Sequence, residues 1–203
     1  MISKKIAIEV LNAGLSTGAD YAELFFEDSH ANSVMIENGK VGVSTSNSIC
    51  GVGLRLLKEN KCVYGYTNNL TKAGLIKHAL SLAKSFNSER ILTVSDFKNI
   101  NCKNRNPIND SFDSHSREEK IALLKEGLDE IDKIGDPRIV RTQAAFTNNY
   151  RFVQLYNSKG KTFKRATEFG RIFFVAICAD ENGFESAFEG PGTQAGYNYF
   201  TVE

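Results

Sequence analysis

The three histidines of this sequence are the first side chains to consider for metal-assisted chemistry. A hydrolytic zinc site is most recognisable as an HExxH helix, in which both histidines lie on one face and the glutamate serves as the base. No such motif occurs, and His30, His78 and His115 are far apart in the chain. We interpret each as a surface or capping residue. The sequence also lacks a P-loop and a GxSxG nucleophile, so we predict no catalytic residue and no metal ligand in this chain.

Four cysteines offer a second route to metal or redox chemistry. Cys50, Cys62, Cys102 and Cys178 are dispersed along the chain and form no CxxC pair. This spacing favours free thiols, buried or incidental, over a zinc or redox site.

A run of glycines in strand-like sequence is the first candidate for ligand binding. Gly51, Gly53 and Arg55 alternate with apolar residues and so share one face of the expected strand. The run is not a dinucleotide fingerprint, because Leu56 stands where the third glycine should be. Two interpretations remain open. Arg55 forms an internal ion pair on a strand against which another element packs, or it reaches a peptide or carboxylate across a bare glycine surface.

The second glycine cluster, at Gly190, Gly192 and Gly196, is predicted to be a loop. Residues without Cβ atoms let another chain approach closely, and free N–H groups in such a loop can receive a peptide carbonyl or an anion. The alternative is a structural loop at the end of the last strand. Aromatic residues directly follow, and we expect them to be too near the chain end to be buried and therefore to form an exposed contact surface: Tyr197, Tyr199 and Phe200.

Three helices are expected around these candidates. A three-turn helix begins near Ile2 and stops at Gly14, and a second begins at the N-cap Thr71 and continues to about Phe86. The third begins at Ser116, where Glu119 completes a capping box, and ends at Gly135.

Strand patterns fill most of the remaining sequence, and Asn38-Gly39 predicts a tight hairpin. The run 172–178 is apolar on both faces, which predicts a central strand covered on both sides. The predicted strands cover residues 21–27, 34–37, 41–45, 49–57, 62–67, 91–94, 139–147, 152–157, 162–169, 171–180 and 184–188.

This order of elements predicts an α+β fold, with antiparallel-rich sheets covered by long helices. Two halves, 1–86 and 116–203, are expected to be joined by a polar surface segment, 87–115.

Composition excludes several classes of protein. The 203 residues are 41% hydrophobic and 24% charged, which is ordinary for a globular chain. Lys and Arg number 25 against 24 Asp and Glu, so direct binding to nucleic acid is not expected. The sequence has neither a membrane-length apolar run nor a secretory signal, and we expect a cytoplasmic protein without a membrane partner.

Taken in order, these landmarks resemble the N-terminal region of the TldD/PmbA family, also called modulators of DNA gyrase. The stretch 64–71 is more similar to the TldD branch. The resemblance covers nearly the whole chain and is carried by residues 18–27, 36–39, 51–57, 64–71, 157–160 and 190–197.

The resemblance implies a zinc-dependent peptidase that acts on unfolded or extended peptides, including antibiotic-peptide precursors and antitoxins, as a dimer of family members. In that family an HExxxH helix in the C-terminal half holds the metal. This sequence stops at Glu203 before such a helix. The expected role is therefore an N-terminal domain that shapes the substrate channel and the dimer contact, without a cofactor of its own and inactive alone, while zinc is bound in the C-terminal half. The competing hypothesis is a non-catalytic regulatory module that binds a protein partner.

Overall fold

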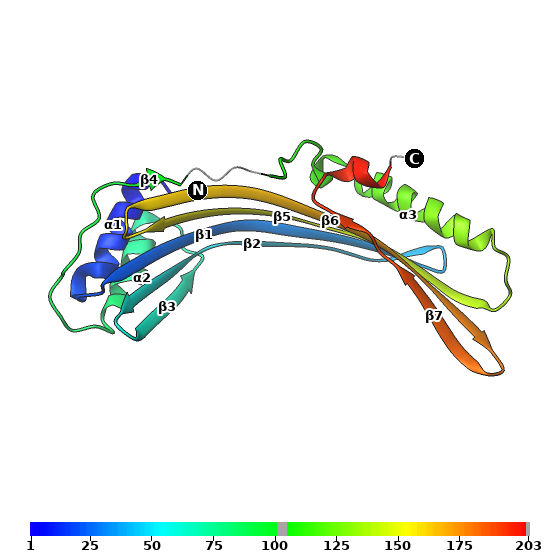
Figure 1. The fold of residues 1–203 in the computed structure, drawn as a ribbon, viewed down its shortest axis with the longest axis horizontal. Coiled ribbons are helices and arrows are strands. Elements are labelled where there is room, and N and C mark those ends of the chain that lie inside the picture. The colour runs from blue at the N-terminus through cyan, green and yellow to red at the C-terminus, as the bar shows by residue number, and fades with distance from the viewer. Residues whose placement is uncertain (101–104, 202–203) are drawn as a thin grey trace. The chain divides into compact units, whose positions relative to one another are not determined.

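The computed structural model describes residues 1–100 and 105–201. It confirms an α+β fold, in which helices accompany a sheet that is largely antiparallel (Figure 1). The strand order is β3-β2-β1-β5-β6-β4, and β7 and β8 also pair with β6. The short strands are β3 (Lys61–Thr67), β4 (Lys98–Asn99), β7 (Gly183–Glu189) and β8 (Gly192–Thr193).

The other strands are longer than the sequence pattern predicts. Each of them joins two predicted strands into one, so the predicted breaks near residues 28–33, 46–48, 148–151 and 170 are wrong. The hydrogen bonds between paired strands join backbone groups, so polar side chains do not interrupt a strand. Residues 46–48, for example, continue β2 although they are exposed to solvent. The long strands are β1 (Tyr21–Glu37), β2 (Lys40–Lys58), β5 (Ile139–Asn157) and β6 (Lys161–Asp180).

The hairpin between β1 and β2 is confirmed. Asn38 and Gly39 have φ angles of 46° and 73°, in the left-handed region that a two-residue turn of this kind requires.

The strand predicted over 91–94 is wrong. The Asn12 side chain receives a hydrogen bond from the Val94 N–H and donates one to its carbonyl, both at 2.8 Å. The Asn12 side chain thus takes the hydrogen bonds that a partner strand would make with Val94. The chain joins the sheet only later, where β4 pairs with β6.

All three predicted helices are confirmed: α1 (Lys4–Gly14), α2 (Lys72–Ala83) and α3 (Arg117–Asp132). The N-caps Ser3 and Thr71 accept backbone hydrogen bonds, and α3 has the complete capping box of Ser116 and Glu119. Short 3₁₀ helices are η1 (Leu15–Thr17), η2 (Phe112–Ser114) and η3 (Tyr197–Phe200). In the described ranges, no helix combines the length and the apolar character that crossing a bilayer requires.

Two compact units divide the chain, and both take segments from distant parts of the sequence. The first comprises residues 1–29, 49–104 and 152–166, and the second comprises residues 30–48, 105–151 and 167–203. In the first unit, α1 and α2 pack together over apolar residues of β1 and β2, such as Leu24 and Leu54. In the second unit, α3 buries Leu124 and Leu128 against residues including Phe146 and Ile172.

The central strand predicted at 172–178 is only partly covered. Ile172 is buried, but residues 173–178 are half-buried. The neighbouring strand β7 is exposed along its whole length.

Candidate functional site

Arg55 lies in the first unit, on β2, opposite Tyr64 of β3. Its Nη2 atom donates to Glu23 Oε1 at 3.0 Å. This geometry agrees with the ion-pair interpretation of Arg55.

The glycine face beside Arg55 is not bare, contrary to the peptide-binding interpretation. A Cβ atom on Gly53 would lie 2.6 Å from the hydroxyl of Tyr64, and one on Gly51 would lie 2.2 Å from that of Tyr66. The two tyrosines of β3 therefore lie across the glycines of β2, which explains why this strand has no side chains there.

Tyr21 extends this polar cluster on β1. Its hydroxyl donates to Glu23 Oε2 at 2.6 Å. Burial, together with this bond to the carboxylate, raises the pKa of Tyr21 to about 12. Glu23 therefore holds both Tyr21 and Arg55, one with each carboxylate oxygen.

The three loop glycines all lie in the second unit, so the structure groups them apart from Arg55. A Cβ atom on Gly190 or Gly192 would lie 2.8 Å from the ring of Phe188 or Phe169, respectively. Gly196 has a φ of 105°, and its Cβ would lie 2.6 Å from the carbonyl oxygen of Asp110. Close packing therefore explains why a glycine occupies each of these positions.

Several backbone groups of this loop are already hydrogen-bonded. Gly192 pairs with Arg171 between β8 and β6, and the Gly190 carbonyl accepts from Arg171 Nε at 3.3 Å. The Tyr197 N–H donates to the Asp110 carbonyl at 3.3 Å. These contacts favour a structural role, and a peptide-binding role for the loop stays a prediction.

The aromatic residues after the loop do not form the expected exposed surface. Tyr197 is 5% exposed and stacks on His115, with ring centroids 3.9 Å apart. Phe200 packs against Phe112 and Phe146, and Tyr199 is the exposed member of the three. The chain end can bury these rings because η3 turns them onto the core of the second unit.

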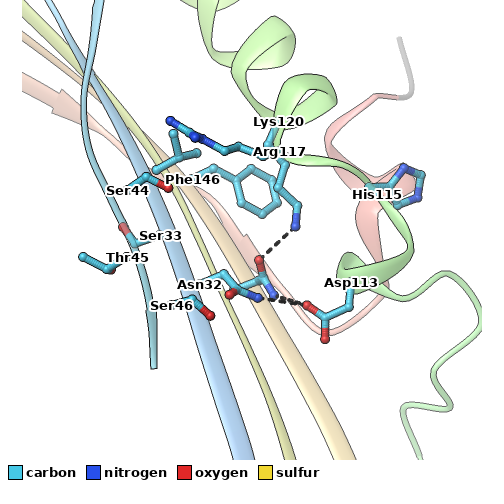
Figure 2. A pocket seen from close by; sticks show the side chains of 12 residues that line it. Asn32, Ser33, Ser44, Thr45, Ser46, Asp113, His115, Arg117, Lys120 and Phe146 are labelled. Carbon is cyan, nitrogen blue, oxygen red and sulfur yellow. Dashed lines mark hydrogen bonds between the residues drawn. The ribbon is translucent and has the colours of Figure 1, made fainter. Parts of the chain in front are cut away.

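The second unit also contains a polar pocket that the sequence did not predict, with a volume of about 370 Å³ (Figure 2). Its walls come from β1, β2 and β5 on one side and from η2 and the first turn of α3 on the other. The lining residues are Asn32, Ser33, Val34, Ser44, Thr45, Ser46, Asp113, His115, Arg117, Lys120, Phe146 and Asn148.

A chain of hydrogen bonds fixes the polar groups of this pocket (Figure 2). Asp113 accepts from Asn148 Nδ2 at 3.0 Å and from Asn32 Nδ2 at 3.1 Å, and it also contacts His30 Nε2. Because the Asn148 amide donates to Asp113, its oxygen is turned toward Lys120, whose Nζ donates to it at 3.2 Å.

Lys120 is the unusual residue of the pocket, since its side chain is among the buried ones at 7% exposure. Its ammonium group also lies 5.5 Å from the centroid of the Phe146 ring, within the range of a cation–π contact. Burial lowers the pKa of Lys120, although the carboxylates of Asp113, Glu119 and Glu168 act in the opposite direction.

Sequence reasoning missed this pocket for a definable reason. Asn148 falls in the gap between the strands predicted over 139–147 and 152–157, and Lys120 precedes the apolar stripe of α3 and looks like a surface lysine. Only the pairing of β5 within the sheet, together with the docking of α3, buries the two together.

Within the described residues, the histidines and cysteines form no group suited to a metal ion. No group of three or more His, Cys, Asp or Glu side chains suited to a metal ion occurs in residues 1–100 and 105–201. His30 and His115 contact Asp113 and Asp110, respectively, and His78 packs over Gly65 of β3. Free thiols are present at Cys50, Cys62 and Cys178, and Cys102 lies outside the described residues.

Comparison with known protein families shows the family of this chain. Residues 22–85 match the family described as PmbA/TldA metallopeptidase domain 1, and residues 110–202 match the PmbA/TldA metallopeptidase central domain. The chain belongs to the PmbA/TldD metallopeptidase family. The resemblance read from the sequence is therefore confirmed.

Curated relatives of this PmbA/TldD family member include two proteins named metalloprotease TldD homolog. The one from Buchnera aphidicola subsp. Acyrthosiphon pisum is 22% identical over 89% of this chain and 37% of its own length. The one from Haemophilus influenzae is 22% identical over 98% of this chain and 42% of its own length. The chain thus spans about two fifths of these relatives.

Solved structures of the family share the fold. A protein from Bacteroides thetaiotaomicron that is described as a modulator of DNA gyrase is 19% identical and has a TM-score of 0.76 over 96% of this chain and 45% of that one. A second, from Thermotoga maritima, is 17% identical and has a TM-score of 0.72 over 94% of this chain and 43% of that one.

Proposed function

We propose that this chain forms the substrate-channel and dimer-forming part of a zinc metallopeptidase that cleaves unfolded or extended peptides. The match to two consecutive metallopeptidase domains of one family carries the proposal. The described residues do not fit a zinc site, because no suitable donor group is present among them. Hydrolysis would therefore depend on a region comparable to the part of the relatives that this chain does not span.

A channel for extended peptides would bind mainly to the peptide backbone, since backbone groups are common to every sequence. The loop at Gly190, Gly192 and Gly196 remains our candidate for that contact. Arg55 would serve as a charge anchor only if a peptide carboxylate replaced Glu23 as its partner.

The strand β7 is our candidate for the dimer contact. It pairs with β6 along one edge, and within the described residues its other edge has no partner strand. Phe184 and Phe188 are 79% and 57% exposed on it. Exposed edges of this kind are templates for pairing with a second chain.

The pattern of β7 suits antiparallel pairing with a second copy of itself. Pairing centred on Ser186 places Phe184 opposite Phe188 and Glu185 opposite Ala187, so no like charges face each other. Aromatic cross-strand pairs stabilise such contacts.

The decisive experiment compares two purified proteins with an unstructured reporter peptide. One is a longer family protein whose first part is this chain, and the other is the 203-residue chain alone. We expect cleavage by the first that a chelator abolishes and zinc restores, and no cleavage by the second. Cleavage that survives complete removal of metal would refute the proposal.

The competing function is a regulatory module that binds a protein partner, as the gyrase-modulator description of the related structures suggests. The same assay separates the two functions. Stable partner binding by a longer protein that cleaves no peptide under any metal condition would favour the regulatory module.

A further inference from the structure

The polar pocket of the second unit has no role in the function proposed above, yet its charges are arranged for a ligand. Two cationic side chains, Arg117 and Lys120, extend into it from the first turn of α3 (Figure 2). The one carboxylate in its lining, Asp113, is already held by donors from His30, Asn32 and Asn148.

Lys120 retains unused hydrogen-bonding capacity. An ammonium group has three N–H donors, and Asn148 Oδ1, at 3.2 Å, is its one hydrogen-bond acceptor among the described residues. Burying a charged group costs free energy unless it is paired. Asp113, Glu119 and Glu168 act on the Lys120 charge, but the group hydrogen-bonded to it is a neutral amide, so a negatively charged ligand can still bind it directly.

The opposite wall supplies neutral hydroxyl groups. Ser44 and Ser46 share one face of β2 and line the pocket, and hydroxyls both donate and accept hydrogen bonds. They can complete the coordination of an anion without adding charge.

The charge balance distinguishes between anions. The lining has two cations against one carboxylate, and Glu119 and Glu168 also act on Lys120, so the site can offset little negative charge, which suits a monoanionic carboxylate better than a phosphate dianion. The volume of about 370 Å³ lies at the small end of ligand sites and suits a short group, such as a peptide end, rather than a folded partner.

We propose that this pocket binds a carboxylate carried by a peptide, with Lys120 and Arg117 as its cationic partners and Asn148 as the residue that positions Lys120. Arg117 can form two parallel hydrogen bonds to the carboxylate, and Lys120 acts as a point charge beneath it. The inference rests on the proposed function only in taking a peptide as the ligand.

Calorimetric titration of the 203-residue protein with three N-acetylated alanine-based tetrapeptides tests the proposal. The first has a free C-terminal carboxylate, the second is its C-terminal amide, and the third is an amide with an internal glutamate. We expect the first to bind at least ten-fold more tightly than the second. If the third binds as well as the first, with the same dependence on Lys120, the pocket recognises side-chain carboxylates too and the proposal stands.

Three variants locate the binding site. Lys120→Met should weaken binding of the free acid at least ten-fold, and Arg117→Gln at least three-fold. Lys125→Met, an exposed lysine of the same helix, should leave it unchanged. Because Arg117 is exposed, its variant decides the matter if Lys120→Met fails to fold.

Equal affinity for acid and amide, no measurable binding of any peptide, or full affinity in the Arg117 variant and in a folded Lys120 variant would overturn the inference. This test is independent of peptidase activity. Carboxylate binding without zinc-dependent cleavage by the longer protein would refute only the proposed function, and cleavage without carboxylate binding would refute only this inference.

Discussion

Individual side chains of the first unit explain features that the sequence left open. Arg55 pairs with Glu23, and the glycines beside it accommodate the rings of Tyr64 and Tyr66. Packing against the tyrosines of β3 therefore accounts for the glycines of β2, and an ion pair accounts for Arg55, without a bound peptide.

Tyr21 should make the free energy of unfolding depend on pH in the alkaline range. Its pKa is about 12 in the folded protein against about 10 in an unfolded chain. Between these values the unfolded state loses a proton that the folded state keeps, so the free energy of unfolding falls as pH rises from about 10 to 12.

We expect Tyr21→Phe to flatten this decline, as measured by urea unfolding at several pH values, whereas a Phe substitution at the exposed Tyr199 should change it less. Burial also raises the pKa values of Tyr156 and Tyr197, so part of the decline will remain. An identical slope in the Tyr21 variant would show that burial and the bond to Glu23 do not raise the pKa of Tyr21.

Gly192→Val tests the glycine loop. The new Cβ would lie 2.8 Å from the Phe169 ring, which is partly exposed and can turn aside, so we expect the fold to survive. If a peptide backbone lies against this loop, turnover by the longer protein should fall about ten-fold, or about 1.4 kcal/mol of transition-state binding.

A matched control is Gly42→Val on β2, because its Cβ has only ordinary contacts and its φ is not in the left-handed region. Gly160, with a φ of 69°, is unsuitable, since any side chain there is strained. Unchanged turnover in the Gly192 variant, or loss explained by unfolding, would make the loop purely structural.

The helices show how much local sequence can specify. The second and third begin at the predicted caps, Thr71 and Ser116, because serine and threonine hydroxyls satisfy N–H groups that have no partner within the helix. Ser3 caps the first helix in the same way but was not predicted. The strand lengths and the pocket were not predictable in this way. They depend on which distant segments pair, and neither Asn148 nor Lys120 carries a local mark of being buried.

Ser116→Ala should lower the free energy of unfolding by about 1 kcal/mol, because it removes the acceptor for the Glu119 N–H at 3.1 Å. Chemical denaturation measures the change. Thr71→Ala, at the start of α2, should cost a similar amount. Ser81→Ala, at an exposed position inside α2, should be neutral or slightly stabilising, and a comparable loss there would show that capping is not the cause.

For the molecule as a whole, the exposed strand β7 predicts self-association. We expect Phe184→Lys to weaken association in sedimentation experiments, because it places a charge in the aromatic cross-strand pair. Ile91→Lys, at another exposed apolar residue, should not do so. A strictly monomeric protein, or equal association of both variants, would argue against β7 as the dimer contact.

The interleaving of the two compact units has a kinetic consequence. Each of the strands β1, β2, β5 and β6 begins in one unit and ends in the other, so residues 1–29 complete their unit only with residues 152–166. Neither unit can therefore be cut out as one continuous fragment. Pairings between such distant segments give a high contact order, and proteins of that kind fold in milliseconds to seconds rather than microseconds. During synthesis, the first unit must wait for most of the chain to emerge, which leaves its apolar strands open to chaperones.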